Sequence, residues 1–318
     1  MNKKVLVFKT GYTEFLDGNQ NSRIVSMGDV LRTTCLLPKF KENQYHLTWV
    51  TSEEAKPLLA KNPLIDRLLP FDLMTTLQLE SEEFDKIVNL EKIPGICALS
   101  DKVRARKSRH GFTFNSQTGE AEALDNASEV FTISNNPHDK KNNKRTFQSL
   151  LYELLGEEFN GEEYVLGYKP KTTECYDLGL NTNVGSKWPS KAWPIENWGK
   201  LEEILGNSVS ISRQDKQCNK VLHDLHSYID WINSCKTLIS NDSLGLHVAL
   251  ALKKNVIGLF GPTSANEIYF YNRGNAVLPQ NILPCIPCFN YKCDLDKSCM
   301  EDINPKQVAE ACKDYLGQ

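Results

Sequence analysis

The sequence has no hydrophobic run that could cross a membrane. A membrane-spanning helix needs about 18 apolar residues, and the longest runs here are short ones such as Val256–Phe260. The N-terminal residues Met1–Lys4 lead directly into the strand-like Val5–Phe8, without the apolar stretch of a signal peptide. We therefore expect a soluble, cytoplasmic protein.

The chain also lacks an excess of charge of one sign. Its 318 residues include 37 Lys and Arg and 40 Asp and Glu, which gives a formal net charge of −3. This balance argues against nucleic acid as a partner. Hydrophobic residues make up 40% of the chain, no internal repeat is visible, and the length suits two globular domains.

Strand-like and helix-like segments alternate through both halves of the chain. In the first half, strands are expected at 4–8, 46–51 and 84–90, with helices at 29–40, 52–61 and 150–155. In the second half, strands are expected at 176–181, 208–212, 236–241 and 256–260, with helices at 195–205, 226–235 and 244–252. This alternation predicts an α/β protein of two doubly wound, Rossmann-like domains, residues 1–165 and 172–304, followed by a C-terminal helix within 305–318.

Two turns rich in small residues follow neighbouring strands of the second half. The first is Asp242-Ser243-Leu244-Gly245, where a strand ends and a helix begins at once, and the second is Gly261-Pro262-Thr263. The free N–H groups at a helix start bind phosphate well. Helix capping would explain Asp242 or Ser243 alone, but two such turns at adjacent strand ends favour a ligand site.

Two further segments bring charged side chains to strand-to-helix loops. The segment Ser186–Trp198 contains two lysines and three tryptophans, so a lysine could neutralise a phosphate, although an ordinary surface loop explains it equally well. The segment Gly28-Asp29-Val30-Leu31 opens a helix in the first half. Its carboxylate could act as a general base, but from position alone an ordinary helix-start carboxylate is the better explanation.

Four of the ten cysteines are clustered with the spacing C-x2-C-x4-C-x5-C. They are Cys285, Cys288, Cys293 and Cys299. In a reducing compartment such a cluster indicates a metal site before it indicates disulfides, and four thiolates suit zinc and iron alike. The metal would be structural, because four protein ligands leave no open position for catalysis. Reduced thiols in a proline-rich loop are the alternative.

A dense basic run, Lys102–His110, contains no acidic residue. It could line the acceptor side of a cleft and hold an anionic acceptor. The residues that would do so are Arg104, Arg106, Lys107 and Arg109. A solvated basic face or a membrane-surface patch explains the run at least as well.

These ordered motifs together resemble the ADP-heptose:lipopolysaccharide heptosyltransferases of glycosyltransferase family 9. The resemblance rests on Gly28-Asp29-Val30-Leu31, Lys191-Ala192-Trp193-Pro194, Asp242–Gly245 with His247, and Gly261-Pro262-Thr263, and spans roughly residues 4–312. It implies a GT-B fold, in which two Rossmann-like domains face a central cleft and the C-terminal domain holds the nucleotide sugar. It also implies inverting transfer without a catalytic metal.

The resemblance assigns a role to each matching residue. Asp29 takes the position of the general base that deprotonates the acceptor hydroxyl, and Lys191 that of the lysine that contacts the donor's phosphates. The donor-binding positions are Asp242, Ser243, Leu244, Gly245, His247, Gly261, Pro262 and Thr263.

The acceptor is less closely specified. The loop Lys9–Ser26 is longer than in core-sugar enzymes, and the related autotransporter heptosyltransferases carry a similar iron-binding cysteine finger. The leading hypothesis is transfer of heptose from ADP-heptose to a lipopolysaccharide inner-core acceptor, which would bring the protein into peripheral contact with the inner membrane. The alternative is transfer to a protein hydroxyl. A nucleotide-binding protein without catalysis and a nucleotide-sugar epimerase of the same fold are more distant rivals.

Overall fold

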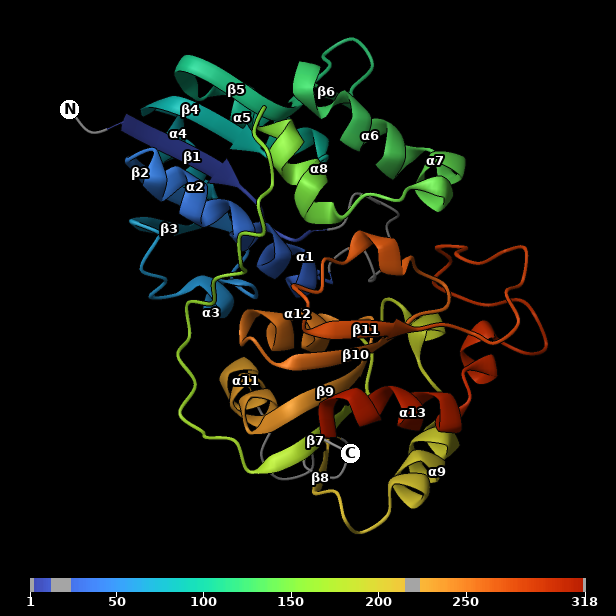
Figure 1. Cartoon of the computed structure of the whole chain (residues 1–318). Helices are drawn as coiled ribbons and strands as arrows, with labels where there is room; N and C mark the ends of the chain where they lie inside the picture. Colours follow the sequence, from blue (N-terminus) through green and yellow to red (C-terminus); the bar gives the residue numbers. More distant parts are fainter. Residues whose placement is uncertain (1–2, 13–23, 215–223, 317–318) are drawn as a thin grey trace. The chain divides into compact units, whose positions relative to one another are not determined.

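Two sheets, each with its own covering helices, make up the chain (Figure 1). The computed structural model describes residues 3–12, 24–214 and 224–316. It separates into two compact units, one of Met1–Lys140 with Arg145–Tyr168, and the other of Lys141–Lys144 with Lys169–Gln318. Both units are α/β with parallel or mostly parallel sheets, as the alternation of strands and helices predicts.

The N-terminal sheet has six strands in the order β3-β2-β1-β4-β5-β6, and only β6 runs antiparallel to its neighbour. The strands are β1 (Lys3–Phe8), β2 (Tyr45–Thr51), β3 (Arg67–Pro70), β4 (Glu83–Asn89), β5 (Arg104–Phe114) and β6 (Ala121–Ala123). The connecting helices and 3₁₀ turns are α1 (Met27–Arg32), η2 (Thr33–Leu36), α2 (Leu37–Glu42), α3 (Lys56–Leu59), α4 (Leu73–Glu80), α5 (Pro94–Lys102), η3 (Asp125–Ala127), α6 (Ser128–Asn135), α7 (Pro137–Asn142) and α8 (Phe147–Leu154).

The C-terminal sheet has five parallel strands in the order β11-β10-β9-β7-β8. The strands are β7 (Tyr176–Asn181), β8 (Ile211–Arg213), β9 (Cys235–Asn241), β10 (Asn255–Leu259) and β11 (Gly274–Val277). The helices and 3₁₀ turns are η4 (Pro189–Lys191), α9 (Ile195–Leu205), α11 (Leu225–Asn233), α12 (Leu244–Ala251), η5 (Ala265–Glu267), η6 (Cys299–Asp302) and α13 (Pro305–Leu316). Helices α9 and α13 pack together, and α11 packs against α12.

Each sheet reverses its strand order once. In the N-terminal unit the chain passes from β1 outward to β2 and β3, and then returns to β4 on the other side of β1. In the C-terminal unit the reversal lies between β7 and β9. Ligands of doubly wound sheets bind at the carboxyl ends of the strands where the order reverses. The fold therefore indicates one candidate ligand site in each unit, at the carboxyl ends of the strands where the order reverses.

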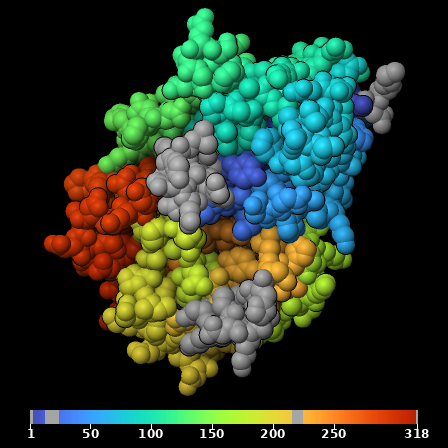
Figure 2. Space-filling view, turned by 180° about the vertical axis from the view of Figure 1, so that it is seen from behind, coloured from blue at the N-terminus to red at the C-terminus, as the bar shows by residue number. Residues whose placement is uncertain are grey.

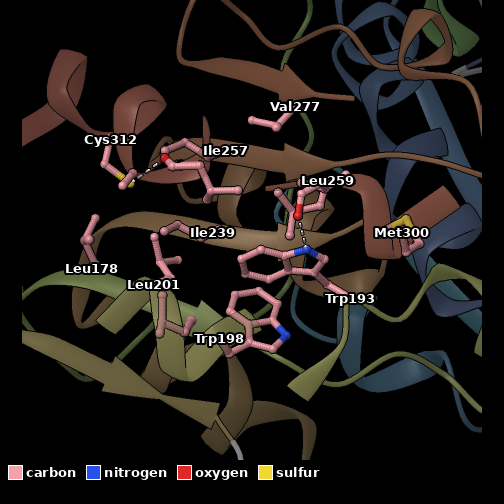
Figure 3. Packing of buried hydrophobic residues seen from close by; sticks show 14 of the residues in the cluster. Leu178, Trp193, Trp198, Leu201, Ile239, Ile257, Leu259, Val277, Met300 and Cys312 are labelled. Atoms are coloured by element: carbon pink, nitrogen blue, oxygen red, sulfur yellow. Dashed lines mark hydrogen bonds between the residues drawn. The ribbon is translucent and has the colours of Figure 1, made fainter. Parts of the chain in front are cut away.

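Two tryptophans of the Ser186–Trp198 loop belong to the core of the C-terminal unit (Figure 3). The rings of Trp193 and Trp198 meet edge to face with their centres 4.8 Å apart, and Trp193 Nε1 donates a hydrogen bond of 2.9 Å to the carbonyl oxygen of Ile303. The backbone N–H of Trp193 also donates to Asn241 Oδ1 at 3.0 Å. These contacts anchor the loop that carries Lys191 against the end of β9.

A buried carboxylate fixes the start of the loop that leads to Asp29. Glu91, only 2% exposed, follows β4 and accepts hydrogen bonds from the backbone N–H groups of Thr10 and Gly11, which follow β1. Gly11 then accepts a bond of 2.7 Å from the N–H of Ser26, the residue before α1. Gly11 has a φ of +81°, and an added Cβ would lie 2.8 Å from Val30, so a side chain is excluded there.

No helix among residues 3–12, 24–214 and 224–316 is long and apolar enough to cross a membrane.

The hydrogen bonds that Glu91 accepts predict a clear difference in stability between two variants. Glu91→Leu leaves two buried N–H donors without an acceptor. We therefore expect the free energy of unfolding to fall by at least about 1–3 kcal/mol, which is the cost of one unsatisfied buried donor. Glu91→Gln keeps an acceptor oxygen and should lose less. Urea unfolding of both variants measures the difference, and a Glu91→Leu variant as stable as wild type would contradict the assigned role.

Candidate functional site

The carboxyl ends of β9 and β10 in the C-terminal unit bring three predicted site residues together. Lys191 Nζ lies 2.7 Å from Asp242 Oδ2, and Thr263 Oγ1 donates a hydrogen bond of 2.8 Å to the same oxygen. The Lys191 and Asp242 side chains are 16% and 13% exposed. Lys191 also lies over the ring of Trp188, 5.0 Å from its centre. The two turns found in the sequence are thus joined through one carboxylate.

The electrostatics of this cluster keep Asp242 ionised. Burial by itself raises the pKa of Asp242, but the charges of Lys191 and His247, with hydrogen bonds from Lys191 and Thr263, outweigh burial and lower this pKa to about 2. His247 is a buried residue of α12, one turn inside the helix. Since Lys191 and Asp242 compensate each other's charge, attraction for an anion must come largely from the N–H groups at the start of α12.

A buried hydrogen-bond network supports the first turn of α12. Ser243 precedes this helix, but its hydroxyl makes no capping bond and instead accepts a hydrogen bond of 2.9 Å from Asn181 Nδ2. Asn181 also accepts a bond of 2.7 Å from the hydroxyl of Tyr228. At the start of α12, the N–H groups of Leu244 and Gly245 precede that of Leu246, which donates to the carbonyl oxygen of Ser243 at 3.2 Å.

Gly245 is needed for packing rather than for ligand approach. A Cβ at Gly245 would lie 2.4 Å from Asn181 Nδ2 and 2.4 Å from the Tyr228 hydroxyl. The hydrogen-bonded Asn181–Tyr228 pair therefore explains why this position is a glycine. Asn181 and Tyr228 carried no signal in the sequence, because an asparagine at a strand end and a tyrosine in a helix are unremarkable.

The second turn is held by the cysteine-bearing segment, which lies in the orange-red region of the surface in Figure 2. Pro262 accepts a hydrogen bond of 2.7 Å from the N–H of Phe289, and a Cβ on Gly261 would lie 2.7 Å from Cys299 Sγ. The same segment reaches the Lys191 loop, because Ser190 Oγ donates to the carbonyl oxygen of Asn290 at 2.7 Å. Both walls of the Lys191–Asp242–Thr263 cluster therefore contact residues 289–299.

The four clustered cysteines do not form a metal centre as they stand. Cys285 and Cys293 are exposed, Cys288 is half-buried, and Cys299 is buried. Burial, reinforced by the neighbouring thiolates, raises the pKa of Cys299 to about 11, so this group is a neutral thiol near pH 7. Within the described ranges no group of three or more His, Cys, Asp and Glu side chains is arranged to hold a metal ion.

In the N-terminal unit, Asp29 lies in the first turn of α1, beside the carboxyl end of β1. Its side chain is 45% exposed, and its Oδ1 lies 3.6 Å from Arg32 Nη1. The position coincides with the reversal of strand order between β1 and β4. Of the long loop Lys9–Ser26, residues 13–23 lie outside the described part of the chain.

The basic run forms the first part of β5, and acidic residues of β4 neutralise much of it. Arg104 and Arg106 both pair with Glu83, and Lys107 Nζ lies 3.6 Å from Asp85. Glu83 stands opposite Arg104 in the sheet, at the amino end of β4. This pairing leaves no signal in the sequence, because the acidic partners come from a separate segment.

Arg109 has a structural environment within the N-terminal unit. Its guanidinium donates to the backbone carbonyl oxygens of Ser100, Asp101 and Val103 at the end of α5. A cation at the carboxyl end of a helix also interacts favourably with the helix dipole. Arg104, Arg106 and Lys107 lie at the amino edge of the sheet, whereas Asp29 follows the carboxyl edge. The acceptor role of these four residues stays a prediction. Their ion pairs, hydrogen bonds and position in the sheet do not favour it.

Comparison with known proteins finds a family resemblance in part of the C-terminal unit. Residues 213–299 match the model of glycosyltransferase family 9 (heptosyltransferase), a range that contains both turns and the four cysteines. The lipooligosaccharide heptosyltransferase 2 of Campylobacter jejuni serotype O:2 is 30% identical over 125 residues, which are 37% of this chain and 39% of that protein. The chain thus aligns with well under half the length of this relative. The predicted resemblance to glycosyltransferase family 9 is confirmed for residues 213–299.

Solved structures resemble the chain over nearly its full length. The ADP-heptose lipopolysaccharide heptosyltransferase II of E. coli has a TM-score of 0.65 at 13% identity, with 99% of both chains covered. The iron-containing dodecameric glycosyltransferase TibC from enterotoxigenic E. coli has a TM-score of 0.58 at 13% identity, with 99% of this chain and 76% of that chain covered. At these identities the likeness concerns the fold, and it confirms the predicted GT-B class.

The low pKa of Asp242 predicts how stability depends on pH. The pKa of Asp242 is about 2 in the folded protein, whereas that of an unperturbed aspartate is 3.8. Ionised Asp242 therefore adds stability above about pH 4, and this stability is lost as the pH falls toward 2. The contribution is about 2 kcal/mol. Asp242→Asn should therefore flatten the fall in unfolding free energy between about pH 4 and 2.

Urea unfolding at several pH values measures this slope. Thr263→Val is the matched variant, because it removes one hydrogen bond to Asp242 and leaves the charge of Lys191 in place. Its slope should lie between those of wild type and Asp242→Asn. An unchanged slope in Asp242→Asn would show that the Lys191–Asp242 pair does not lower the pKa as described.

Proposed function

We propose that the chain is an inverting glycosyltransferase that moves a heptose from ADP-heptose to a hydroxyl of a lipopolysaccharide core acceptor. The family match of residues 213–299 and the name of the Campylobacter relative support heptosyl transfer. The name of the E. coli structural neighbour supports ADP-heptose as the donor. The observation that carries the proposal is the Lys191–Asp242–Thr263 cluster beside the start of α12, at the strand-order reversal of the C-terminal unit.

The donor's diphosphate would bind at the start of α12. The N–H groups at the start of this helix and the ammonium group of Lys191 suit phosphate oxygens. Lys191 uses one N–H on Asp242 and has two others to offer a ligand. The ionised Asp242 carboxylate is an acceptor only, so it suits a sugar hydroxyl rather than a phosphate. The ends of β9 and β10 thus offer complementary groups to both parts of a nucleotide sugar.

The transfer step is a single displacement. The acceptor oxygen forms a bond to the anomeric carbon while the bond from that carbon to the diphosphate breaks, and the configuration at the carbon inverts. Negative charge develops on the departing diphosphate, where Lys191 and the N–H groups of α12 would stabilise it. The proton of the acceptor hydroxyl passes to Asp29, whose half-exposed carboxylate is open to a substrate. No step of this mechanism runs through a metal ion.

A protein hydroxyl is the second candidate acceptor, and the four clustered cysteines are the observation behind it. Their segment contacts both walls of the donor site through Phe289, Asn290 and Cys299. A structural zinc or iron there would require the four sulfur atoms to converge further than they do in this structure. It therefore stays a prediction that elemental analysis of the purified protein decides.

A transfer assay tests the proposed donor and acceptor together. We expect a heptose-sized mass increase when the protein is incubated with ADP-heptose and a deep-truncated lipopolysaccharide, followed by mass spectrometry of the acceptor. ADP-glucose serves as the control donor, because it keeps the diphosphate and changes the sugar. Binding of ADP-heptose without transfer to the lipid would exclude this acceptor and turn the search to proteins. No binding would remove the donor assignment.

The role of Asp29 predicts a loss of turnover with intact donor binding. Asp29→Asn should lower transfer by about 10²–10⁴-fold, the usual contribution of a general base, because the amide cannot accept the proton. Donor affinity should stay at the wild-type value, since the donor groups lie in the other unit. Steady-state kinetics and calorimetric donor binding measure the two quantities.

Asp72→Asn is the matched control for this substitution. Asp72 also stands at a helix start of the N-terminal unit, and its side chain caps α4 by accepting the N–H of Thr75. Asparagine caps a helix about as well as aspartate, so this variant should transfer heptose normally. Transfer by Asp29→Asn at the wild-type rate would show that another group takes the proton.

A further inference from the structure

Arg32, the last residue of α1, is buried with few partners. Its side chain is 9% exposed, and its Nη1 lies 3.6 Å from Asp29 Oδ1. Its guanidinium carbon lies 3.6 Å from the centre of the Phe147 ring, which belongs to the first turn of α8. Two nitrogens of the group, Nε and Nη2, are buried and have no hydrogen-bond partner. The guanidinium therefore rests on one carboxylate and one ring face.

Folding stability does not explain this arrangement. Removing a cation from water is costly, and the cost is offset only when most of its N–H groups find acceptors. Arg109, in the same unit, donates to three backbone carbonyl oxygens. At Arg32 an apolar side chain of similar length would fill the space without leaving two buried nitrogens unpaired. A role in function accounts for the charge that stability does not require.

The partner of Arg32 is the proposed general base. Asp29 is 45% exposed, and its Oδ1 faces Arg32. The ring of Phe147 limits the positions that the guanidinium can take, because a planar cation is most stable against an aromatic face. Phe147 and Arg32 come from different helices. The packing between these helices therefore restricts the guanidinium and, through it, the carboxylate of Asp29.

We propose that Arg32 is a positioning residue for Asp29, held by Phe147. This inference rests on the proposed function. Arg32 fixes Oδ1 of Asp29 through its Nη1 and so orients the carboxylate that takes the proton. When the acceptor hydroxyl gives up its proton, the carboxylate becomes neutral, and the charge of Arg32 remains beside the π face of Phe147.

Arg32→Met separates this role from a structural one. We expect kcat to fall by up to about 10²-fold, the effect of misplacing a reacting group by about 1 Å. The KM for the donor should not change. The melting temperature should be unchanged or higher, because a poorly paired buried charge is replaced by an apolar chain and Asp29 remains hydrated. Arg32→Lys keeps the charge and should retain more activity than Arg32→Met.

Two other variants complete the experiment. Arg67→Met is the matched control, because Arg67 makes a two-pronged ion pair with Glu82 elsewhere in the same unit. It should lower the melting temperature and keep kcat, the reverse of the pattern expected for Arg32→Met. Phe147→Leu keeps the charge of Arg32 and removes the ring, so it should lower kcat less than Arg32→Met. It also tests the inference if Arg32→Met fails to fold.

The outcomes distinguish failure of this inference from failure of the proposed function. If Asp29→Asn abolishes transfer while Arg32→Met and Phe147→Leu keep the wild-type kcat, the inference is wrong and the base assignment stands. A fall in melting temperature of Arg32→Met that accounts for its lost activity would also overturn the inference, since Arg32 would then be structural. If Asp29→Asn itself transfers normally, the base assignment fails and the inference fails with it.

Discussion

The ion pair between Lys191 and Asp242 is the contact on which the C-terminal unit's site depends. It joins a loop after β7 to the end of β9, and Thr263 extends it to the end of β10. Neither charge would be stable alone in this mostly buried position. The pair therefore fixes three chain segments relative to one another.

A comparable constraint operates in the N-terminal unit, where Glu91 acts on the backbone that leads to α1 and Arg32 acts on Asp29. Glu91 fixes the backbone at Thr10 and Gly11, and this backbone in turn holds Ser26 just before α1. Arg32 acts on the carboxylate itself. Both are buried charges beside the reversal of strand order in their sheet. In each unit, then, the position at which a doubly wound fold binds ligands is also where the protein keeps costly polar groups.

The sequence predicted those features that local pattern determines. Continuous apolar runs such as Val5–Phe8 became central parallel strands, and the turn at Asp242 became the start of a helix. It did not predict β5, because most of the strand's side chains are polar and its partner acids Glu83 and Asp85 come from another segment. Contacts between distant residues, such as Asn181 with Ser243, leave no periodic trace. The sequence also did not reveal why residue 245 is a glycine, because the neighbouring Asn181 and Tyr228 are distant from it in the chain.

The contacts of residues 289–291 with the donor site are made by backbone atoms. Phe289 donates its N–H to Pro262, and Asn290 and Tyr291 accept from Ser190 through their carbonyl oxygens. Substitution of these side chains would leave the bonds in place. Related chains could therefore differ freely in sequence along this segment and still brace the site in the same way. Alignment columns here would look unconstrained, although the segment shapes the site as directly as the residues that face the donor.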